Sequence, residues 1–482
     1  MFKQGGVILT LLGIIFRRPA ALVGAIMFAL LFPILLLSVF IDLQGGIENP
    51  YFSLFIYLIL GPLSILALVL LAVGLIRVNR QGLGEHYTYE FFKEQLTNPE
   101  QSRRIRRLVY NATFFISLFL LFLGVVAYSG HSFTDSSRFC GTFCHTVMEP
   151  EYVTFKNSPH SQVSCVACHI EQNAQGVTKA KFTGMKQLYA TFFNTYERPL
   201  QTPLQSLRPT RQICEQCHRP EKFHGHKLTF IDTFLPDEDN SHMQTTMLLK
   251  IGSGGYQGHA PHGIHWHISE QHQLYYQATD AKQQKIIRVE LKEADGTSTI
   301  YHKQGVTAAE RATEYMMDCL DCHNRPTHIF LAPDAALDKK IHAGRIPAEL
   351  PYIKQQALAA ISRPYADAES ARLQIARQLR QWYDSHYPEL SAAQGPLLEK
   401  AISGAQQAYS ENVFPEMNIH WQSSYQSYIG HQNDTGCFRC HNGTLVSDDG
   451  KVISRDCDLC HVILAENVPA KSITEMMQSI PR

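Results

Sequence analysis

Long uninterrupted runs of apolar residues fill much of the first 130 positions of the chain, and shorter alternating patterns follow them. Three of these runs reach the length of about 20 residues that a helix needs to cross a membrane. They cover about 19–41, 51–76 and 108–128. An earlier run, 7–16, is too short to span and has no small-residue cleavage site after it, so we expect an uncleaved interfacial helix there. The pattern predicts a membrane anchor with three transmembrane helices over residues 1–129.

Positive charge is unevenly distributed between the loops of this anchor. Lys3, Arg17 and Arg18 precede the first run, whereas the loop 42–50 contains no Lys or Arg. The segment after the second run, which leads to the third, carries Arg77, Arg80, Lys93, Arg103, Arg104, Arg106 and Arg107. Because Lys and Arg accumulate on the cytoplasmic side of membrane proteins, the N-terminus and this segment are expected inside. The chain after Tyr128 is then expected outside.

Beyond the anchor the periodicity changes twice. The segment 227–305 contains alternating runs such as KLTFIDTF and KIIRVELKEADGTSTIYHK, which predict strands. Asp295-Gly296 lies between two such runs and is a hairpin signal. The segment 347–410 has apolar residues at helical spacing, which predicts helices.

Composition narrows the range of functions. The chain of 482 residues contains 43 Lys and Arg and 43 Asp and Glu, so no basic excess indicates a nucleic-acid partner. No catalytic triad, phosphate-binding loop or dinucleotide fingerprint is present. The distinctive feature is instead the 12 cysteines and 23 histidines.

All the cysteines fall into six close pairs, and a histidine directly follows each pair. Five pairs have two residues between the cysteines and the first has three. The pairs are Cys140 and Cys144, Cys165 and Cys168, Cys214 and Cys217, Cys319 and Cys322, Cys437 and Cys440, and Cys457 and Cys460. The histidines that follow them are His145, His169, His218, His323, His441 and His461. The pattern C-x-x-C-H is typical of c-type haem attachment, in which two thiols bond to the porphyrin and the imidazole ligates its iron.

Zinc coordination, disulfide bonding and thiol redox chemistry fit the cysteine pairs less well. Zinc sites use C-x-x-C pairs but do not require a histidine after every second cysteine. A disulfide framework would leave the six histidines unexplained, and redox C-x-x-C motifs occur singly. We therefore expect six c-type haems in a periplasmic domain with few regular elements. Its parts are a triple-haem module at 130–226, a strand-rich insert at 227–318, and a C-terminal module at 319–482 that holds haems four to six and a helical insert.

Each iron needs a second axial ligand, which is normally histidine or methionine. By their positions near the motifs, the candidates for this distal ligand are Met148, His160, His226, His267, His328 and His431, with His224 and His265 as neighbouring alternatives. Met148 lies three residues beyond His145, so it is a rival of that histidine as much as a partner for it. Methionine ligation would raise the potential of the first haem. His131, His302, His342 and His386 are expected to be ordinary surface residues.

Several segments resemble known cytochromes. The string CGTFCHTVMEPEYVTFKNSPHSQVSCVACH, just after a membrane span, resembles the N-terminal haem pair of the NapC/NirT/NrfH family of quinol-oxidising cytochromes. The strings MDCLDCHNRPTHIF and LPYIKQQA, with the segment 414–461, resemble the larger, ImcH-like inner-membrane members. The simplest members have one anchor helix and four haems, whereas this chain has three apolar spans and six motifs.

The resemblance implies an electron-transfer protein of the bacterial inner membrane, with quinol dehydrogenase activity and periplasmic cytochromes or reductases as acceptors. It also implies a lysine and an acid near the first haem at the quinol site, for which Lys181, Lys186 and Glu197 are the candidates. The lysines could equally lie among lipid headgroups. Two alternatives remain: a periplasmic reductase of a small molecule such as nitrite or hydroxylamine, which needs an open iron position, and a relay subunit of a larger respiratory complex.

Overall fold

The computed structural model describes residues 19–43, 55–80, 97, 99–143, 145–171, 174–201, 210–219, 225–255, 260–306, 311–431 and 435–473. The predicted interfacial helix at 7–16, Cys144 and His224 lie outside these residues, as do the side chains of His145 and Lys181. The chain divides into two compact units, Met1–Phe143 and Cys144–Arg482. The boundary falls inside the first cysteine motif, and each unit is described by itself.

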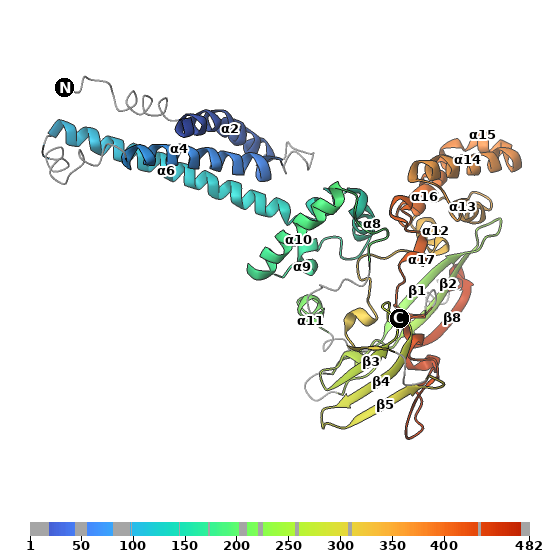
Figure 1. Ribbon diagram of the computed structural model, residues 1–482. Helices are drawn as coiled ribbons and strands as arrows, with labels where there is room; N and C mark the ends of the chain where they lie inside the picture. Colours follow the sequence, from blue (N-terminus) through green and yellow to red (C-terminus); the bar gives the residue numbers. More distant parts are fainter. Residues whose placement is uncertain are drawn as a thin grey trace, which may run out of the picture. The chain divides into compact units, whose positions relative to one another are not determined.

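The described residues of the first unit form helices (Figure 1). They are α2 (Pro19–Leu43), the π-helix η1 (Phe55–Leu60) that continues into α4 (Gly61–Arg80), α6 (Pro99–Thr134) and the short α7 (Ser137–Thr142). Two stretches are long and apolar enough to cross a membrane, Pro19–Ile41 and Thr113–Thr134, and α4 contributes a shorter apolar stretch, Gly61–Gly74. The structure thus supports two of the three predicted spans by length and composition.

Small residues let α2 and α4 approach closely. A Cβ atom on Gly24 would lie 2.4 Å from the backbone nitrogen of Leu71, and one on Gly74 would lie 2.6 Å from that of Ala21. Close approach at glycine is the usual way in which membrane helices associate, because apolar side chains gain little from leaving lipid. Side chains from α2, η1 and α6 form a small buried cluster of Leu35, Val39, Ile56, Leu60 and Val126.

The second unit contains two antiparallel sheets (Figure 1). The three-stranded sheet has the order β1 (Lys227–Phe234), β2 (His242–Leu249) and β8 (His461–Pro469). The five-stranded sheet has the order β6 (Thr313–Met316), β3 (His272–Ala278), β4 (Ile286–Glu293), β5 (Ser298–Lys303) and β7 (Leu445–Ser447). The hairpin predicted at Asp295-Gly296 is confirmed, since it joins β4 to β5 and Gly296 has a φ of +86°. Each sheet also takes one edge strand from beyond residue 440, which the sequence pattern did not predict.

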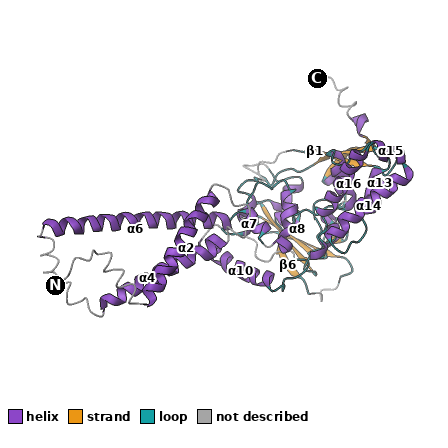
Figure 2. Ribbon diagram, turned by 90° about the horizontal axis from the view of Figure 1, so that it is seen from above, coloured by secondary structure: helices purple, strands orange, loops and turns teal. Residues whose placement is uncertain are grey.

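A group of helices accounts for the helical pattern at 347–410. It comprises α12 (Pro333–His342), α13 (Ile353–Ile361), α14 (Ala368–His386), α15 (Pro388–Ala393) and α16 (Gly395–Ser410), which we call the helical group. On α14, Ala371, Ile375, Leu379 and Tyr383 recur every fourth residue and are all buried. The helices lie beside β1 (Figure 2), and Phe234 of that strand packs into their core.

Candidate haem-ligating site

The five later cysteine motifs each lie on a single turn of helix. The second is α9 (Cys165–His169), the third begins in α11 (Thr210–Cys214), and the last three begin in the 3-10 turns η4 (Cys319–Asp321), η6 (Gly436–Arg439) and η7 (Cys457–Leu459). In three of them the histidine amide donates to the carbonyl of the first cysteine: His218 to Cys214 and His323 to Cys319 at 2.8 Å, and His441 to Cys437 at 3.0 Å. Such a turn presents both thiols and the imidazole on one side. The described cysteines form no disulfide.

Four motif histidines each face one histidine from outside the motifs. The ring centres of His169 and His328 lie 6.3 Å apart, and those of His218 and His160 lie 5.9 Å apart. The corresponding distances are 5.7 Å for His441 and His267 and 6.0 Å for His461 and His431. Metal–imidazole bonds are about 2 Å long, so two imidazoles on opposite sides of one metal have ring centres on the order of 6 Å apart. Each pair therefore has the separation of two axial ligands.

Hydrogen bonds orient several of these imidazoles through Nδ1. The partners are backbone carbonyls: Pro326 for His160 at 3.1 Å, Ile264 for His267 at 2.8 Å, Glu151 for His328 at 2.9 Å and Ser454 for His441 at 2.7 Å. An Nδ1 atom that donates to a carbonyl leaves Nε2 with a free lone pair, which is the form that binds a metal. Burial also lowers the pKa of His267, and burial together with His328 lowers that of His169, which favours the neutral imidazole.

His265 is an electrostatic neighbour of His323 in the fourth motif. Burial lowers the pKa of His265, and the neighbouring His323 lowers it further. His323 is itself held below its usual pKa, mainly by burial and also by His218 of the third motif. The sequence left His265 and His267 as alternatives, whereas the structure places one near each of two different motifs.

Among the described residues, two of the predicted distal ligands, Met148 and His226, are not paired with a motif histidine. Met148 lies half-buried in α8 (His145–Lys156), and the side chain of His145 is outside the described residues. His226 is exposed, and among the described residues no ring contact joins it to a motif histidine. For the first motif, the choice between His145 and Met148 therefore remains as the sequence left it.

From the second motif to the sixth, thiols of successive motifs influence one another's pKa. A hydrogen bond between the thiols of Cys214 and Cys319 raises the pKa of Cys214, and burial and nearby Cys168 raise it further. Burial, with Cys437 next in effect, raises the pKa of Cys322 to about 12. Burial raises the pKa of Cys460, and Cys437 adds to this. Thiols of motif three thus lie near those of two and four, and thiols of motif five near those of four and six.

A partly buried group of charged side chains that the sequence did not reveal lies beside His328, the histidine that faces the second motif. Nδ1 of His328 lies 3.0 Å from Oε2 of Glu151, and Nη1 of Arg325 lies 3.8 Å from the same oxygen. The Arg325 side chain is 7% exposed, and its guanidinium lies 3.8 Å from the ring centre of Tyr425. Glu151 and His328 are far apart in sequence, so no local pattern could have paired them.

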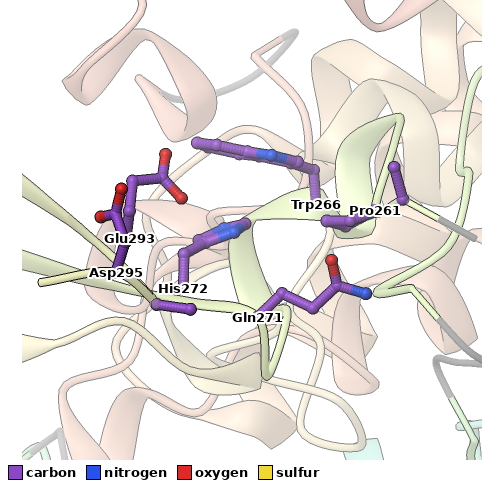
Figure 3. Close-up of a pocket in the computed structure, with 8 residues that line it drawn as sticks. Pro261, Trp266, Gln271, His272, Glu293 and Asp295 are labelled. Carbon is purple, nitrogen blue, oxygen red and sulfur yellow. The ribbon is translucent and has the colours of Figure 1, made fainter. Parts of the chain in front are cut away.

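An open hollow of about 600 Å³ lies beside the distal ligand candidate of the fifth motif (Figure 3). Trp266 lines it and contacts both His267, with ring centres 5.5 Å apart, and His272, at 4.3 Å. Nε2 of His272 is buried and makes no hydrogen bond within the described chain. No motif histidine lines the hollow, so it gives no access to the ligand positions described above.

The predicted quinol-site lysines lie on α10 (Ala174–Phe192), which follows the second motif. Lys186 is exposed. The same helix exposes large apolar side chains at helical spacing, namely Phe182, Met185, Tyr189 and Phe192. Glu197, the candidate acid, is exposed beyond the end of the helix.

Comparisons with known proteins agree with the motifs. Residues 102–227 match the NapC/NirT cytochrome c family, N-terminal region. The chain is 35% identical to "Cytochrome c-type protein ImcH" of Geobacter sulfurreducens over 467 residues, which cover 95% of this chain and 90% of that protein. It is 33% identical to "Cytochrome c nitrite reductase subunit NrfH" of Nitratidesulfovibrio vulgaris over 103 residues, covering 20% of this chain and 62% of that subunit. No solved structure matches the chain.

Proposed function

Because the chain belongs to the NapC/NirT-type membrane-anchored c cytochromes, as its likeness to ImcH over nearly its whole length shows, we propose that it transfers electrons from membrane quinol to periplasmic redox partners. Six covalently attached haems, one for each cysteine motif, supply the redox centres. Quinol releases two electrons, and the haems accept them one at a time. The acceptors are periplasmic cytochromes or a reductase.

The observation that carries the proposal is the pairing of histidines. His328, His160, His265, His267 and His431 serve as distal ligands of haems two to six, opposite His169, His218, His323, His441 and His461. Iron with two histidine ligands has no open position, so it exchanges electrons without binding a substrate. We infer from the mutual influence of these thiols that haems two to six form a row that follows the sequence.

Electrons enter at the membrane end of this row. The exposed apolar side chains of α10 favour contact with the bilayer interface or with quinol. Lys186 on the same helix contributes a cationic amine that can donate a hydrogen bond to a quinol oxygen or to a lipid headgroup. Lys181 belongs to the same helix and has the same proposed role. We assign the first haem as the electron-accepting site next to quinol, with Met148 as its ligand, because thioether ligation raises the haem potential.

We infer that the anchor holds this site at the periplasmic surface of the inner membrane. In addition to the two apolar helices, η1 and α4 run without a break from Phe55 to Arg80, which is long enough for a third span. The distribution of positive charge favours an N-terminus and an 81–107 segment in the cytoplasm, with the haem domain in the periplasm.

The histidine pairs also argue against the alternative, reduction of nitrite or hydroxylamine by this chain itself. Such chemistry needs an iron with an open position, and among the described residues five motif histidines each have a second histidine nearby. A relay subunit of a larger complex would use the same conduit. Subunits that co-purify in mild detergent would identify that case.

The proposal is tested on the full-length protein in liposomes that contain a quinol analogue. Intact mass should exceed that of the polypeptide by six haems, and electron paramagnetic resonance should show low-spin iron. Met148→His should lower one haem potential and slow reduction by the quinol analogue, while reduction by dithionite stays fast. An unchanged rate and spectrum would exclude Met148 as the ligand, and a failure of quinol analogues to reduce the wild-type protein would exclude quinol as donor.

A further inference from the structure

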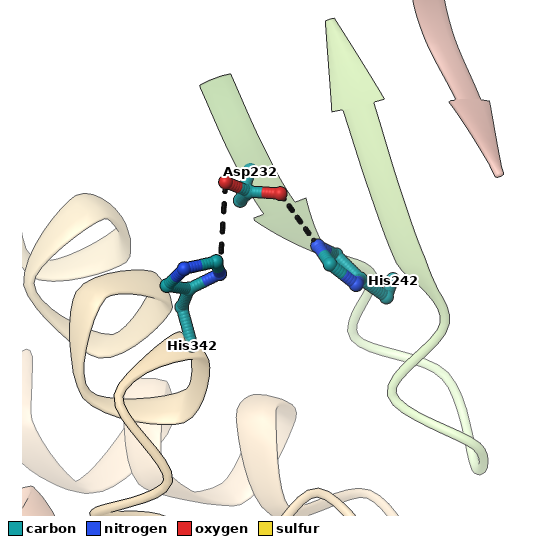
Figure 4. Close-up of side chains that lie close together, drawn as sticks. All are labelled: Asp232, His242 and His342. Carbon is teal, nitrogen blue, oxygen red and sulfur yellow. Dashed lines mark hydrogen bonds and ion pairs between the residues drawn. The ribbon is translucent and has the colours of Figure 1, made fainter. Parts of the chain in front are cut away.

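Three side chains outside the haem motifs converge between the three-stranded sheet and the helical group (Figure 4). Oδ1 of Asp232 on β1 lies 2.7 Å from Nε2 of His242 on β2, and Oδ2 lies 3.6 Å from Nδ1 of His342 at the end of α12. The nearest ligand atoms of the three side chains all lie within 4.8 Å of one another. Neither histidine belongs to the pairs that face the cysteine motifs, so the haem chemistry does not account for them.

The strand pairing positions two of the three side chains. Asp232 pairs with Gln244, and Phe234 pairs with His242, so Asp232 and His242 are diagonal neighbours on one face of the sheet. The ring of Phe234 stacks on that of His242, with centres 4.6 Å apart and planes inclined by 12°. Gln244 donates to Oδ1 of Asp232 at 2.9 Å and so fixes the carboxylate.

A buried contact holds the third side chain near the other two. The amide of Phe234 donates to Oδ1 of Asp338 on α12 at 3.0 Å, and Asp338 also forms a buried ion pair with Lys354. This contact fixes β1 against the helix that carries His342. The His342 side chain itself is 59% exposed, so its imidazole has room to adjust.

We propose that Asp232, His242 and His342 bind a divalent transition-metal cation of the zinc class. Two imidazole nitrogens and one carboxylate oxygen are a donor set that suits zinc and its neighbours, whereas calcium and magnesium prefer oxygen ligands alone. Ligands of one zinc ion with bonds of about 2 Å lie roughly 3–3.5 Å apart, and the two distances from the carboxylate bracket this value. Water completes the coordination on the exposed side.

The bound cation fastens the helical group to the sheet that ends the haem row. β2 carries His242 and pairs directly with β8, whose first residue is His461 of the sixth motif. The cation therefore joins α12 to the strand pair next to the sixth haem. This role is independent of the proposed quinol oxidation.

The test is calorimetric titration with zinc chloride of the full-length, haem-loaded protein, after chelator treatment and desalting. Covalently attached haem keeps its iron under these conditions. The wild-type protein should bind one zinc ion at this site, and His342→Ala and Asp232→Ala should weaken binding by at least the 10–100-fold that loss of an outer-shell partner costs. His302→Ala removes an exposed histidine on β5 and should leave the affinity unchanged.

X-ray absorption at the zinc edge adds a readout that haem iron does not obscure. Two imidazole ligands at about 2.0–2.1 Å are expected in the wild-type protein, and one in His342→Ala. An unchanged haem spectrum and circular dichroism show that each variant is folded. Absence of zinc binding by the wild-type protein, or equal binding by His342→Ala, would overturn the proposal.

Discussion

In the helical group, fully buried apolar side chains hold the helices together, whereas the motif-bearing segments are single helical turns with exposed apolar neighbours. Leu337, Ile353 and Leu379 of the helical group are at most 1% exposed, while Leu459 and Leu464 near the sixth motif are 46% and 58% exposed. The largest buried apolar cluster among the described residues thus belongs to the helical group, while smaller clusters lie near the motifs, one of them around Phe330 and Phe414 and another in the five-stranded sheet. We expect thioether bonds, iron ligands and the porphyrin surface to add to the stability of the motif-bearing segments. Haem is as much a structural component there as leucine is in the helical group.

Removal of the fourth haem should have the largest effect, and this effect should fall on electron transfer and not on the helical group. Replacing Cys319 and Cys322 with serine should prevent attachment in the middle of the row, so electrons from a quinol analogue should reach haems five and six slower by several orders of magnitude. Stopped-flow spectroscopy measures this rate. The circular dichroism of the helical group should persist, because its core contains no haem ligand. An unchanged rate of electron transfer would show that the row does not run through the fourth motif.

Two leucines on α14, one buried and one exposed, test whether the core of the helical group is independent of the haem region. Leu379→Ala should destabilise the helical group by about 2–5 kcal/mol, because loss of this buried side chain leaves a cavity. Leu373→Ala, on the same helix but 55% exposed, should change stability by less than about 0.5 kcal/mol. Denaturant midpoints from circular dichroism compare the two variants. A change in haem spin state in folded Leu379→Ala would contradict the separation of the regions.

Removing one distal ligand should affect the haem region alone. His328→Ala should convert the second haem to a high-spin form that binds carbon monoxide, since His169 would keep its place and the opposite side of the iron would open. Absorption spectra with and without carbon monoxide measure this change. His386→Ala, an exposed histidine on α14, is the control and should remain low-spin. Identical spectra for both variants would show that His328 is not an iron ligand.

The smallest expected effect tests the ion pair that supports His328. Glu151→Gln removes the negative charge beside Nδ1, so the imidazole becomes a weaker donor to ferric iron. One haem potential should rise by roughly 30–60 mV, where 59 mV is a tenfold change for one electron. Glu149→Gln changes the same charge at an exposed position of α8 and should shift the potential less. Redox titration distinguishes the two, and equal shifts would indicate that long-range charge alone acts.

Local patterns in the sequence predicted the features that depend on residues close together in the chain. Asp295-Gly296 predicted its hairpin, because a hairpin turn depends on residues within a few positions, and the cysteine spacing predicts haem attachment on the same local basis. The partner of each imidazole could not be predicted in this way. His160 lies five residues before the second motif, yet it faces His218 of the third. Proximity in sequence is therefore a poor guide where iron joins distant segments.

The edge strands β7 and β8 and the ion pair of Arg325 with Glu151 were not predicted, because they too join segments that are far apart in the sequence. HVILAENVP has no strict alternation, and it becomes strand β8 only by pairing with β2. Arg325 is a charged residue that sequence reasoning places at the surface, but Glu151 and Tyr425 compensate for its burial. Membrane helices are the opposite case, because the lipid environment requires an apolar run that is visible without knowledge of any partner, and the structure supports two of the three predicted spans.

The edge strands β7 and β8 lie late in the sequence, so both sheets are completed only when the C-terminal part of the chain has been made. A chain is made from its N-terminus, so β2 and β5 emerge long before β8 and β7, which lie at 461–469 and 445–447. Until those residues arrive, each sheet keeps an unpaired edge, which is the kind of surface that recruits other chains into aggregates. The turns η6 and η7, which carry the last two cysteine motifs, lie just before β7 and β8. A chain that stops before residue 445 would thus keep an open edge in each of the two sheets.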